Sequence, residues 1–273
     1  MGTALGLASA ACYGIADVAG GLLARRMNFA VVAMVGQAAA FVLVVVVAAV
    51  AVPAQAGAGD LGWGALSGVG TGLGMAFLYR GLARGAMSVV VPVSAVGGLA
   101  IPVAVGVALF GDRPTPLATV GMVVAVPALW LVSGGRARVT SAAVDGLLAS
   151  LGIALQYLAL AAAGPAAGIW PVAAGRLAAV LAIAPLLARS GPGLWPPVRH
   201  LFGAALAGGF AALALVTYLL ATRQQLVSIA VVLSSLYPVI PVLLGLTVLR
   251  ERLGVGQALG LVGAGAAVVL LSL

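Results

Sequence analysis

Most of the chain consists of apolar stretches of about twenty residues, the length at which an α-helix crosses the hydrocarbon core of a bilayer. Short polar junctions separate these stretches and force neighbouring helices to run antiparallel. The pattern predicts an all-α integral membrane protein with ten spans. We place them at residues 3–23, 29–52, 61–82, 86–110, 116–133, 142–163, 166–188, 200–221, 226–249 and 254–272.

The composition indicates that lipid is the solvent for most of this chain. Hydrophobic residues make up 64% of it and charged residues 7%, whereas a soluble domain has about 25% charged residues. All 13 basic residues are arginines, so the lysine of a P-loop nucleotide site and that of a Schiff base are both missing. The arginines are scattered over short loops and form no basic face, which argues against nucleic acid as a partner.

Single copies of two reactive residue types narrow the chemistry further. Cys12 is the one cysteine and His200 the one histidine, so neither an intramolecular disulfide nor a histidine-rich metal site is expected. No catalytic cluster is visible. We therefore expect neither enzyme activity nor a metal or organic cofactor.

The two halves of the chain repeat each other at an offset of about 139 residues, and repetition of this kind changes the fold prediction. The matched pairs are Gly36 and Gly175, Tyr79 and Tyr218, Arg84 and Arg223, Pro102 and Pro241, and Gly121 and Gly260. The repeat predicts two five-helix units, residues 1–135 and 140–273. Because five is odd, the second unit enters the membrane from the opposite face, so the repeats have inverted topology, as in many transporters.

The arginines also bear on orientation. The loops expected on one face carry ten arginines, and the loops on the other face carry Arg113 and Arg223. By the positive-inside rule the rich face is cytoplasmic, which places both termini outside.

Two charged residues lie well inside predicted spans, where charge is costly and usually functional. Asp17 follows Tyr13 by one turn on the same helix face and could exchange a proton for a ligand, or be a neutral or ion-paired structural residue. Arg176 keeps its charge and could bind a substrate carboxylate, or form an internal salt bridge with Asp17. Trp170 precedes Arg176 by more than one turn.

The repeat places polar groups opposite both charges. Asp17 corresponds to Gln156, and Arg176 corresponds to Gln37. We predict an asymmetric polar site for one substrate near the bilayer midplane, within a symmetric scaffold.

Other polar residues and prolines in the spans are weaker candidates. Ser94, Ser234 and Ser235 are interpreted as substrate contacts or as helix-packing residues. Pro102 and Pro241 free a backbone carbonyl and permit a kink, which either shapes the helix or lines a cavity. Tyr79 and Tyr218, near predicted helix ends, are expected to anchor the chain at the membrane interface.

Two segments carry a resemblance to a known family. Pro102 is followed by Phe110-Gly111-Asp112-Arg113, and Pro241 by Leu249-Arg250-Glu251-Arg252. Over nearly its whole length the chain resembles the EamA family of the drug/metabolite transporter superfamily, which shows a proline and then a Gly-Glu-Arg/Lys turn. Asp112 and Arg250 depart from that pattern. The segment 16–25 is similar to the first helix of small multidrug resistance proteins, with Asp17 in place of their proton-exchanging acid.

The resemblance implies a ten-helix secondary carrier in the cell membrane, often an exporter, with cytoplasmic termini. We predict a proton-coupled exporter of small metabolites, amino-acid-like or otherwise polar or amphipathic solutes, or drugs. Its partners would be the substrate and the lipid bilayer, and the protein would be a monomer or a homodimer. The alternatives are a flippase for lipid-linked substrates or drugs and, less favoured, a passive channel.

Overall fold

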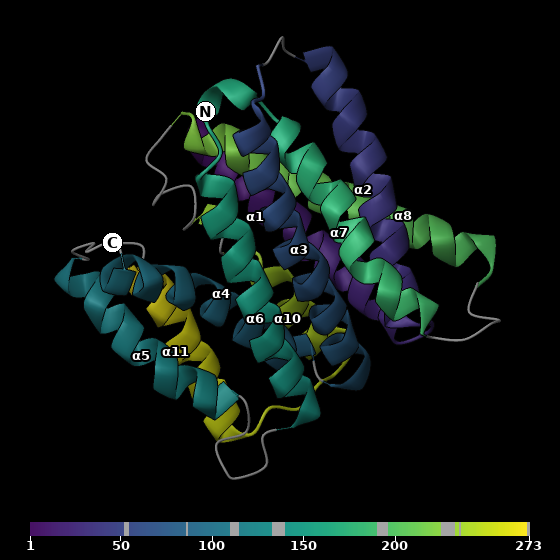
Figure 1. Cartoon of the computed structure of the whole chain (residues 1–273). Helices are drawn as coiled ribbons and strands as arrows, with labels where there is room; N and C mark the ends of the chain where they lie inside the picture. The colour runs from purple at the N-terminus through teal and green to yellow at the C-terminus, as the bar shows by residue number, and fades with distance from the viewer. Residues whose placement is uncertain are drawn as a thin grey trace.

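The computed structural model describes residues 1–51, 55–85, 87–109, 115–132, 140–189, 196–224, 233–234 and 236–271. Within these residues the protein is all-helical, with ten α-helices, one short 3-10 helix and no strand (Figure 1). The elements are α1 (Gly2–Ala24), α2 (Phe29–Ala51), α3 (Ala58–Arg84), α4 (Met87–Leu109), α5 (Pro116–Val132), α6 (Ser141–Ala161), η1 (Pro165–Ala167), α7 (Trp170–Ala188), α8 (Val198–Thr222), α10 (Val239–Thr247) and α11 (Val255–Leu271).

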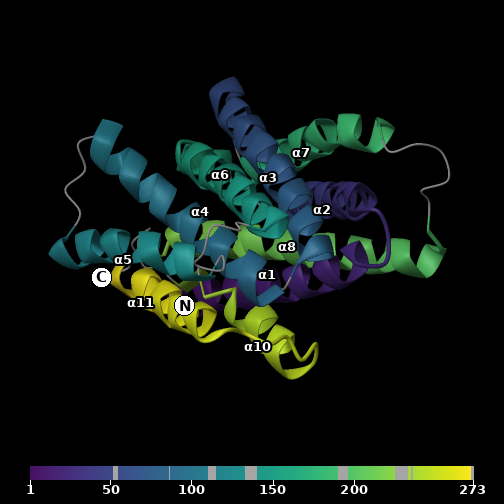
Figure 2. The ribbon, with the colours of Figure 1, turned by 90° about the horizontal axis from the view of Figure 1, so that it is seen from below.

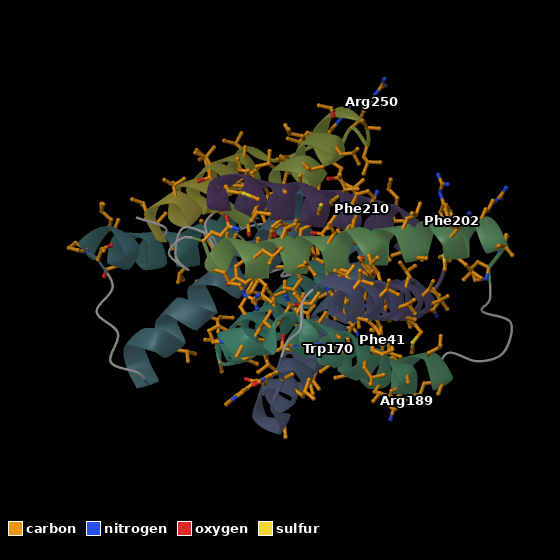
Figure 3. The ribbon with its side chains drawn as sticks, turned by 90° about the horizontal axis from the view of Figure 1, so that it is seen from above. Phe41, Trp170, Arg189, Phe202, Phe210 and Arg250 are labelled. Atoms are coloured by element: carbon orange, nitrogen blue, oxygen red, sulfur yellow. The ribbon has the colours of Figure 1, made fainter. Side chains whose placement is uncertain are left out.

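Six of these helices are long and apolar enough to cross a membrane, namely α1, α2, α3, α6, α7 and α8. Large apolar side chains cover their outer faces, as at Leu181 and at Phe202, which is 65% exposed near one end of α8 (Figure 3). Because water would not tolerate so much exposed apolar surface, the chain is a multi-pass membrane protein. The predicted all-α class is confirmed.

The remaining predicted spans are described less completely. Residues 87–98, 119–128 and 255–267 are shorter apolar helical segments. Much of the predicted ninth span, residues 226–249, lies outside the described residues. Its described part contains a turn at residues 236–238 and then α10.

Helices from the two halves of the chain pack against each other in a regular order (Figures 1 and 2). In one half of the pattern α3 packs against α6 and α7, while in the other α8 packs against α1 and α2. Likewise α4 packs against α6, and α10 against α1. The pair α5 and α11 lies side by side at one edge of the molecule, and the bounds of these two helices differ by 139 residues at both ends.

Glycines allow the central helices to cross in backbone contact. A Cβ atom on Gly68 of α3 would overlap the backbone of Gly175 in α7, and one on Gly208 of α8 would overlap the backbone of Gly36 in α2. Small residues are how membrane helices approach closely, because lipid supplies no hydrophobic force to press larger faces together. These two crossings position α2, α3, α7 and α8 around the centre of the molecule.

Two helices begin at residues other than those predicted, one because of a polar contact and the other because of a glycine turn. Helix α3 begins at Ala58 rather than residue 61 because Asp60 lies in its first turn, where its carboxylate accepts hydrogen bonds from the N–H groups of Gly57 and Gly164 at 3.1 and 2.7 Å. Helix α7 begins at Trp170 rather than residue 166 because η1 precedes it and Gly168 has a φ of 61°.

Substituting the crossing glycine should destabilise the protein. Gly68→Ala places a methyl group against the Gly175 backbone, which cannot turn aside, so we expect a loss of about 1–3 kcal/mol in the free energy of unfolding. Gly59, in the same helix, has open space around it. Gly59→Ala is the matched control and should be neutral or slightly stabilising. Thermal unfolding in detergent compares the two, and equal midpoints would contradict the crossing.

Candidate functional site

The five tyrosines of the chain gather inside the molecule. Tyr79, Tyr218 and Tyr237 are buried, while Tyr13 and Tyr157 are partly buried. Two tilted ring contacts join four of them in pairs, Tyr13 with Tyr237 at 5.9 Å and Tyr157 with Tyr218 at 5.5 Å between centroids. They come from α1, α3, α6, α8 and the turn before α10.

The expectation that Tyr79 and Tyr218 anchor the chain at the membrane interface is therefore wrong. Tyr79 is only 2% exposed, and its ring and hydroxyl lie directly over Gly20 of α1. Gly20 lacks the side chain that would hold the ring away. The tyrosine consequently turns inward to the protein rather than outward to the lipid headgroups.

Arg176 is the one arginine buried at the centre of the described residues, with 2% exposure. Its Nη1 donates to Oε1 of Gln37 and its Nη2 to the carbonyl oxygen of Ala211, each at 2.9 Å. The Tyr13 hydroxyl lies beside the same guanidinium. Its Nε has no hydrogen-bond partner among the described residues. The guanidinium is thus held by neutral groups, with a donor left over.

Asp17 is also buried, with 3% exposure, on the face of α1 that carries Gly20 and Tyr13. The internal salt bridge considered from the sequence does not form, because no Arg176 nitrogen lies within ion-pair distance of the Asp17 carboxylate. Both side chains lie near Tyr13 and Tyr79. A buried carboxyl and a buried guanidinium therefore lie near the same tyrosines without a direct contact between them.

Gln156, the repeat counterpart of Asp17, is tied into a hydrogen-bond network between α3 and α6. Its Oε1 accepts from Thr71 Oγ1 at 2.7 Å, and its carbonyl oxygen accepts from Ser67 Oγ at 2.9 Å. Its Nε2 donates to the Tyr13 hydroxyl at 3.5 Å. This network connects the interior of the second half to the α1 residues that precede Asp17.

The other predicted residues are placed less centrally. Ser94 is buried, and its hydroxyl donates to the carbonyl of Val91 one turn earlier. Ser234 is buried with no hydroxyl partner among the described residues, while Ser235 lies outside the described residues. Trp170 is partly buried at the start of α7 and packs on the apolar cluster around Val172.

The two kink prolines remain predictions. Helix α4 runs through Pro102, whose side chain is not among those described. Pro241 lies in the first turn of α10, which begins directly after Pro238, and a proline costs a helix little in that position.

Sequence reasoning missed two carboxylates that close one end of the molecule. Asp145 of α6 is buried and accepts from Nε of Arg80 at 2.9 Å, with Arg84 also within ion-pair distance. Glu251, between α10 and α11, pairs with Arg25 at 3.1 Å. The signal for Asp145 was its place in the first turn of the predicted span 142–163, where a carboxyl needs a partner.

Glu251 also caps the first turn of α4. Its carboxylate accepts from the N–H groups of Met87 and Ser88 at 2.9 Å and from the Ser88 hydroxyl at 2.7 Å. Burial by itself would raise the pKa of Glu251, but the hydrogen bonds from Ser88, Met87 and Arg25 outweigh it and hold that pKa below the ordinary value of 4.5. One side chain therefore joins α1, α4 and the α10–α11 link.

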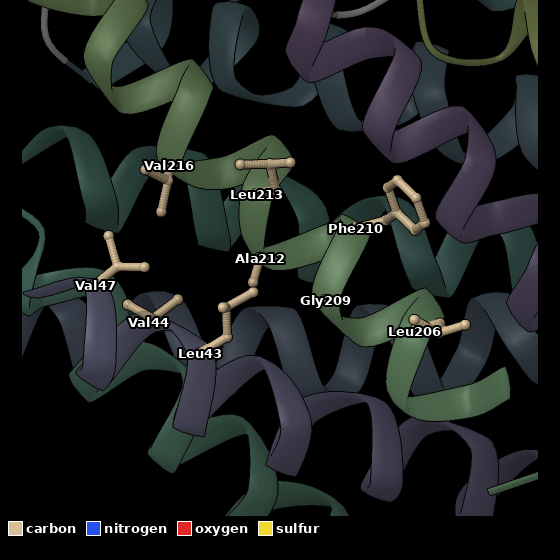
Figure 4. Close-up of a pocket in the computed structure, with 9 residues that line it drawn as sticks. All are labelled: Leu43, Val44, Val47, Leu206, Gly209, Phe210, Ala212, Leu213 and Val216. Atoms are coloured by element: carbon tan, nitrogen blue, oxygen red, sulfur yellow. The ribbon is translucent and has the colours of Figure 1, made fainter. Parts of the chain in front are cut away.

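Two apolar hollows open on the membrane-facing surface. One, of about 310 Å³, lies between α2 and α8 (Figure 4); the second, of about 230 Å³, lies among α4, α10 and α11. Neither contains a residue of the tyrosine-lined region. The floor of the first includes Ala212, next in sequence to the Ala211 carbonyl that Arg176 binds. Within the described residues, no group of His, Cys, Asp and Glu side chains could hold a metal ion.

Comparisons with known proteins inform the fold alone. No protein-family model and no curated protein matches the sequence. Among solved structures, one crystal structure aligns over 98% of this chain and 95% of its own, with a TM-score of 0.59 and 17% sequence identity. The helical arrangement is therefore shared with that protein.

Acid should weaken the contacts of the Glu251 carboxylate with Arg25 and with the first turn of α4. A carboxyl with a depressed folded-state pKa stabilises the protein above its ordinary pKa, and that contribution is lost as pH falls through the folded-state value. We expect Glu251→Gln to lower the unfolding temperature at neutral pH, and to lose less than the wild type between neutral pH and about pH 3. Thermal unfolding at both pH values tests this, and equal acid sensitivity of the two proteins would refute it.

Proposed function

We propose that the protein is a secondary active transporter of the cell membrane that exports small metabolites bearing a carboxylate or another polar group. It works by alternating access between two inverted five-helix repeats. Asp17 couples transport to protons, and Arg176 orients the substrate. The proton gradient is the energy source, and the chain needs no enzyme activity for this role.

The observation that carries the proposal is the state of Arg176. A guanidinium keeps its proton when buried, so it needs acceptors for its donors and a counter-charge nearby. Among the described residues the acceptors are an amide and a backbone carbonyl, with the Tyr13 hydroxyl beside them, the Nε has no partner, and the buried carboxyl of Asp17 is not in contact. A substrate carboxylate would supply both the missing acceptor and the missing charge.

The arrangement of helices supports the two-repeat mechanism. Shifting α3 by 139 residues gives α8, and shifting α1 and α2 gives α6 and α7, to within a few residues at each end. Under the same shift, the packing of α3 on α6 and α7 becomes the packing of α8 on α1 and α2. Inverted repeats that place a polar site between them are the architecture of many secondary transporters.

The apolar hollow beside Ala212 favours one alternative, a flippase for lipid-linked or drug-like substrates. On that mechanism the apolar part of the substrate would enter from the lipid into the hollow between α2 and α8, and its polar head would reach Arg176. A water-soluble exported compound, and activity insensitive to lipid composition, would exclude it.

Export is tested by metabolite profiles of spent medium from cells that overproduce the wild type or Arg176→Ala. Arg189→Ala is the matched control, since Arg189 is exposed at the end of the same helix and points away from the bundle (Figure 3). At equal membrane abundance, we expect one class of compound to accumulate with the wild type and with Arg189→Ala. Arg176→Ala should reduce it at least about tenfold, since each lost charged hydrogen bond is worth about 1.5–3 kcal/mol. Identical profiles for all three would refute the assignment.

Proton coupling is tested with Asp17→Asn in vesicles preloaded with the identified compound. A carboxamide cannot exchange a proton, so an imposed pH gradient should no longer accelerate efflux, while exchange of labelled for unlabelled compound continues. Asp60→Asn is the control, because Asp60 accepts hydrogen bonds at the beginning of α3 and lies outside the central region. Unchanged pH dependence in Asp17→Asn would rule out the coupling role.

A further inference from the structure

The hydrogen bond between Gln37 and Arg176 joins residues that are separated by 139 positions, which is the offset of the repeat. When two equivalent groups of a two-fold arrangement touch each other, both must lie close to the axis that relates them. The contact is 2.9 Å long, so both side-chain tips lie close to the axis, given the two-fold relation of the repeats.

The helix crossings on either side agree with this placement. Gly36, just before Gln37, meets the backbone of Gly208, and Gly175, just before Arg176, meets the backbone of Gly68. Each polar residue therefore follows a point at which its helix crosses a helix of the other half. Both residues are almost fully buried.

We infer that Gln37 and Arg176 form one anion-binding site on the pseudo-two-fold axis. This site needs a single cation, and either repeat could supply it from its own position in the pair. The inference rests on the proposed function and specifies its substrate as a carboxylate-bearing compound. Gln37 is a positioning residue, because its Oε1 holds the Nη1 of Arg176 and leaves the unpartnered Nε for the ligand.

The axial position explains why one repeat carries arginine and the other glutamine. A second arginine at position 37 would place two guanidinium groups at hydrogen-bond distance, where like charges in a low-dielectric interior repel strongly. Glutamine at both positions would leave no charge for the anion. One cation and one neutral acceptor is the combination that binds an anion and remains stable without it.

The position also suits alternating access. When the two repeats exchange conformations, groups far from the axis change their exposure to the two sides of the membrane. A group on the axis occupies the same place in both states. A carboxylate bound there can therefore be released to either side while its anchor remains fixed.

The inference makes an exchange of the two residues informative. In the double variant Gln37→Arg/Arg176→Gln, the guanidinium starts from α2 and reaches nearly the same point. Its second acceptor would be the carbonyl of Gly72 in α3, which lies 139 residues before Ala211 of α8. The variant keeps composition and charge constant, so it tests position alone.

Four proteins are compared in detergent by thermal unfolding: the wild type, Arg176→Gln, Gln37→Arg and the double exchange. The probe carboxylate is sodium benzoate, and sodium chloride at equal ionic strength is the control. We expect both single variants to unfold at a lower temperature than the wild type, with the larger decrease for Gln37→Arg. The double exchange should recover more than half of the decrease in unfolding temperature seen in Gln37→Arg. Benzoate should raise the midpoint of the wild type and of the double exchange, and leave Arg176→Gln unchanged.

Losses that simply add in the double exchange would overturn the axial placement, and so would a double exchange that fails to accumulate in membranes when Arg176→Gln accumulates. Benzoate stabilising none of the proteins, or Arg176→Gln equally, would overturn the anion site. Neither readout depends on transport. If exchange and benzoate behave as expected but spent medium is unaltered by the wild type, the proposed export fails and the axial site stands.

Discussion

A buried guanidinium that cannot lose its proton is the constraint around which the centre of this protein is arranged. Arg176 needs acceptors at fixed directions, and it finds them on α2, at Gln37, and on α8, at Ala211. Three helices must therefore meet within the length of one side chain. The Gly36 crossing brings α2 and α8 into backbone contact one residue before Gln37, and the Gly175 crossing brings α7 and α3 into contact one residue before Arg176. The glycines thus allow the close helix approach that the buried guanidinium needs to reach its acceptors.

Charge is handled differently at the centre and at the ends. At membrane depth the described residues hold Arg176 and Asp17 apart, with tyrosine hydroxyls and amides around them. At one end, by contrast, carboxylates pair directly, Asp145 with Arg80 and Glu251 with Arg25. A direct pair satisfies both partners and leaves nothing for a ligand, whereas separated charges remain available. The ion pairs at the end therefore hold helices together, whereas the separated groups at the centre can bind a ligand.

The hydrophobic pattern and the internal repeat predicted the helices and the candidate residues, but they did not predict which side chains contact each other. Span length predicted the helical class and most helix positions, and the offset of 139 paired Gln37 with Arg176 before any contact was known. Polarity at membrane depth selected Asp17 and Arg176, because charge there is rare. Which buried groups touch each other depends on helix rotation and crossing, which periodicity does not determine when helices are apolar on nearly all faces. The inward turn of Tyr79 over Gly20 and the capping of α4 by Glu251 belong to that class.

The turn at Arg250 holds a strained backbone conformation that the neighbouring Glu251 explains. Arg250 is the only non-glycine among the described residues with a positive φ, 53°, a conformation that costs an ordinary side chain about 1–2 kcal/mol. The turn ends α10, with the Glu251 N–H bonded to the Gly245 carbonyl, and it aims the Glu251 carboxylate at the first turn of α4. A glycine there would adopt the same geometry without the cost. The strain at Arg250 is thus stabilised by the bonds of its neighbour, and the conformation of this turn depends on Glu251 remaining bound to α4.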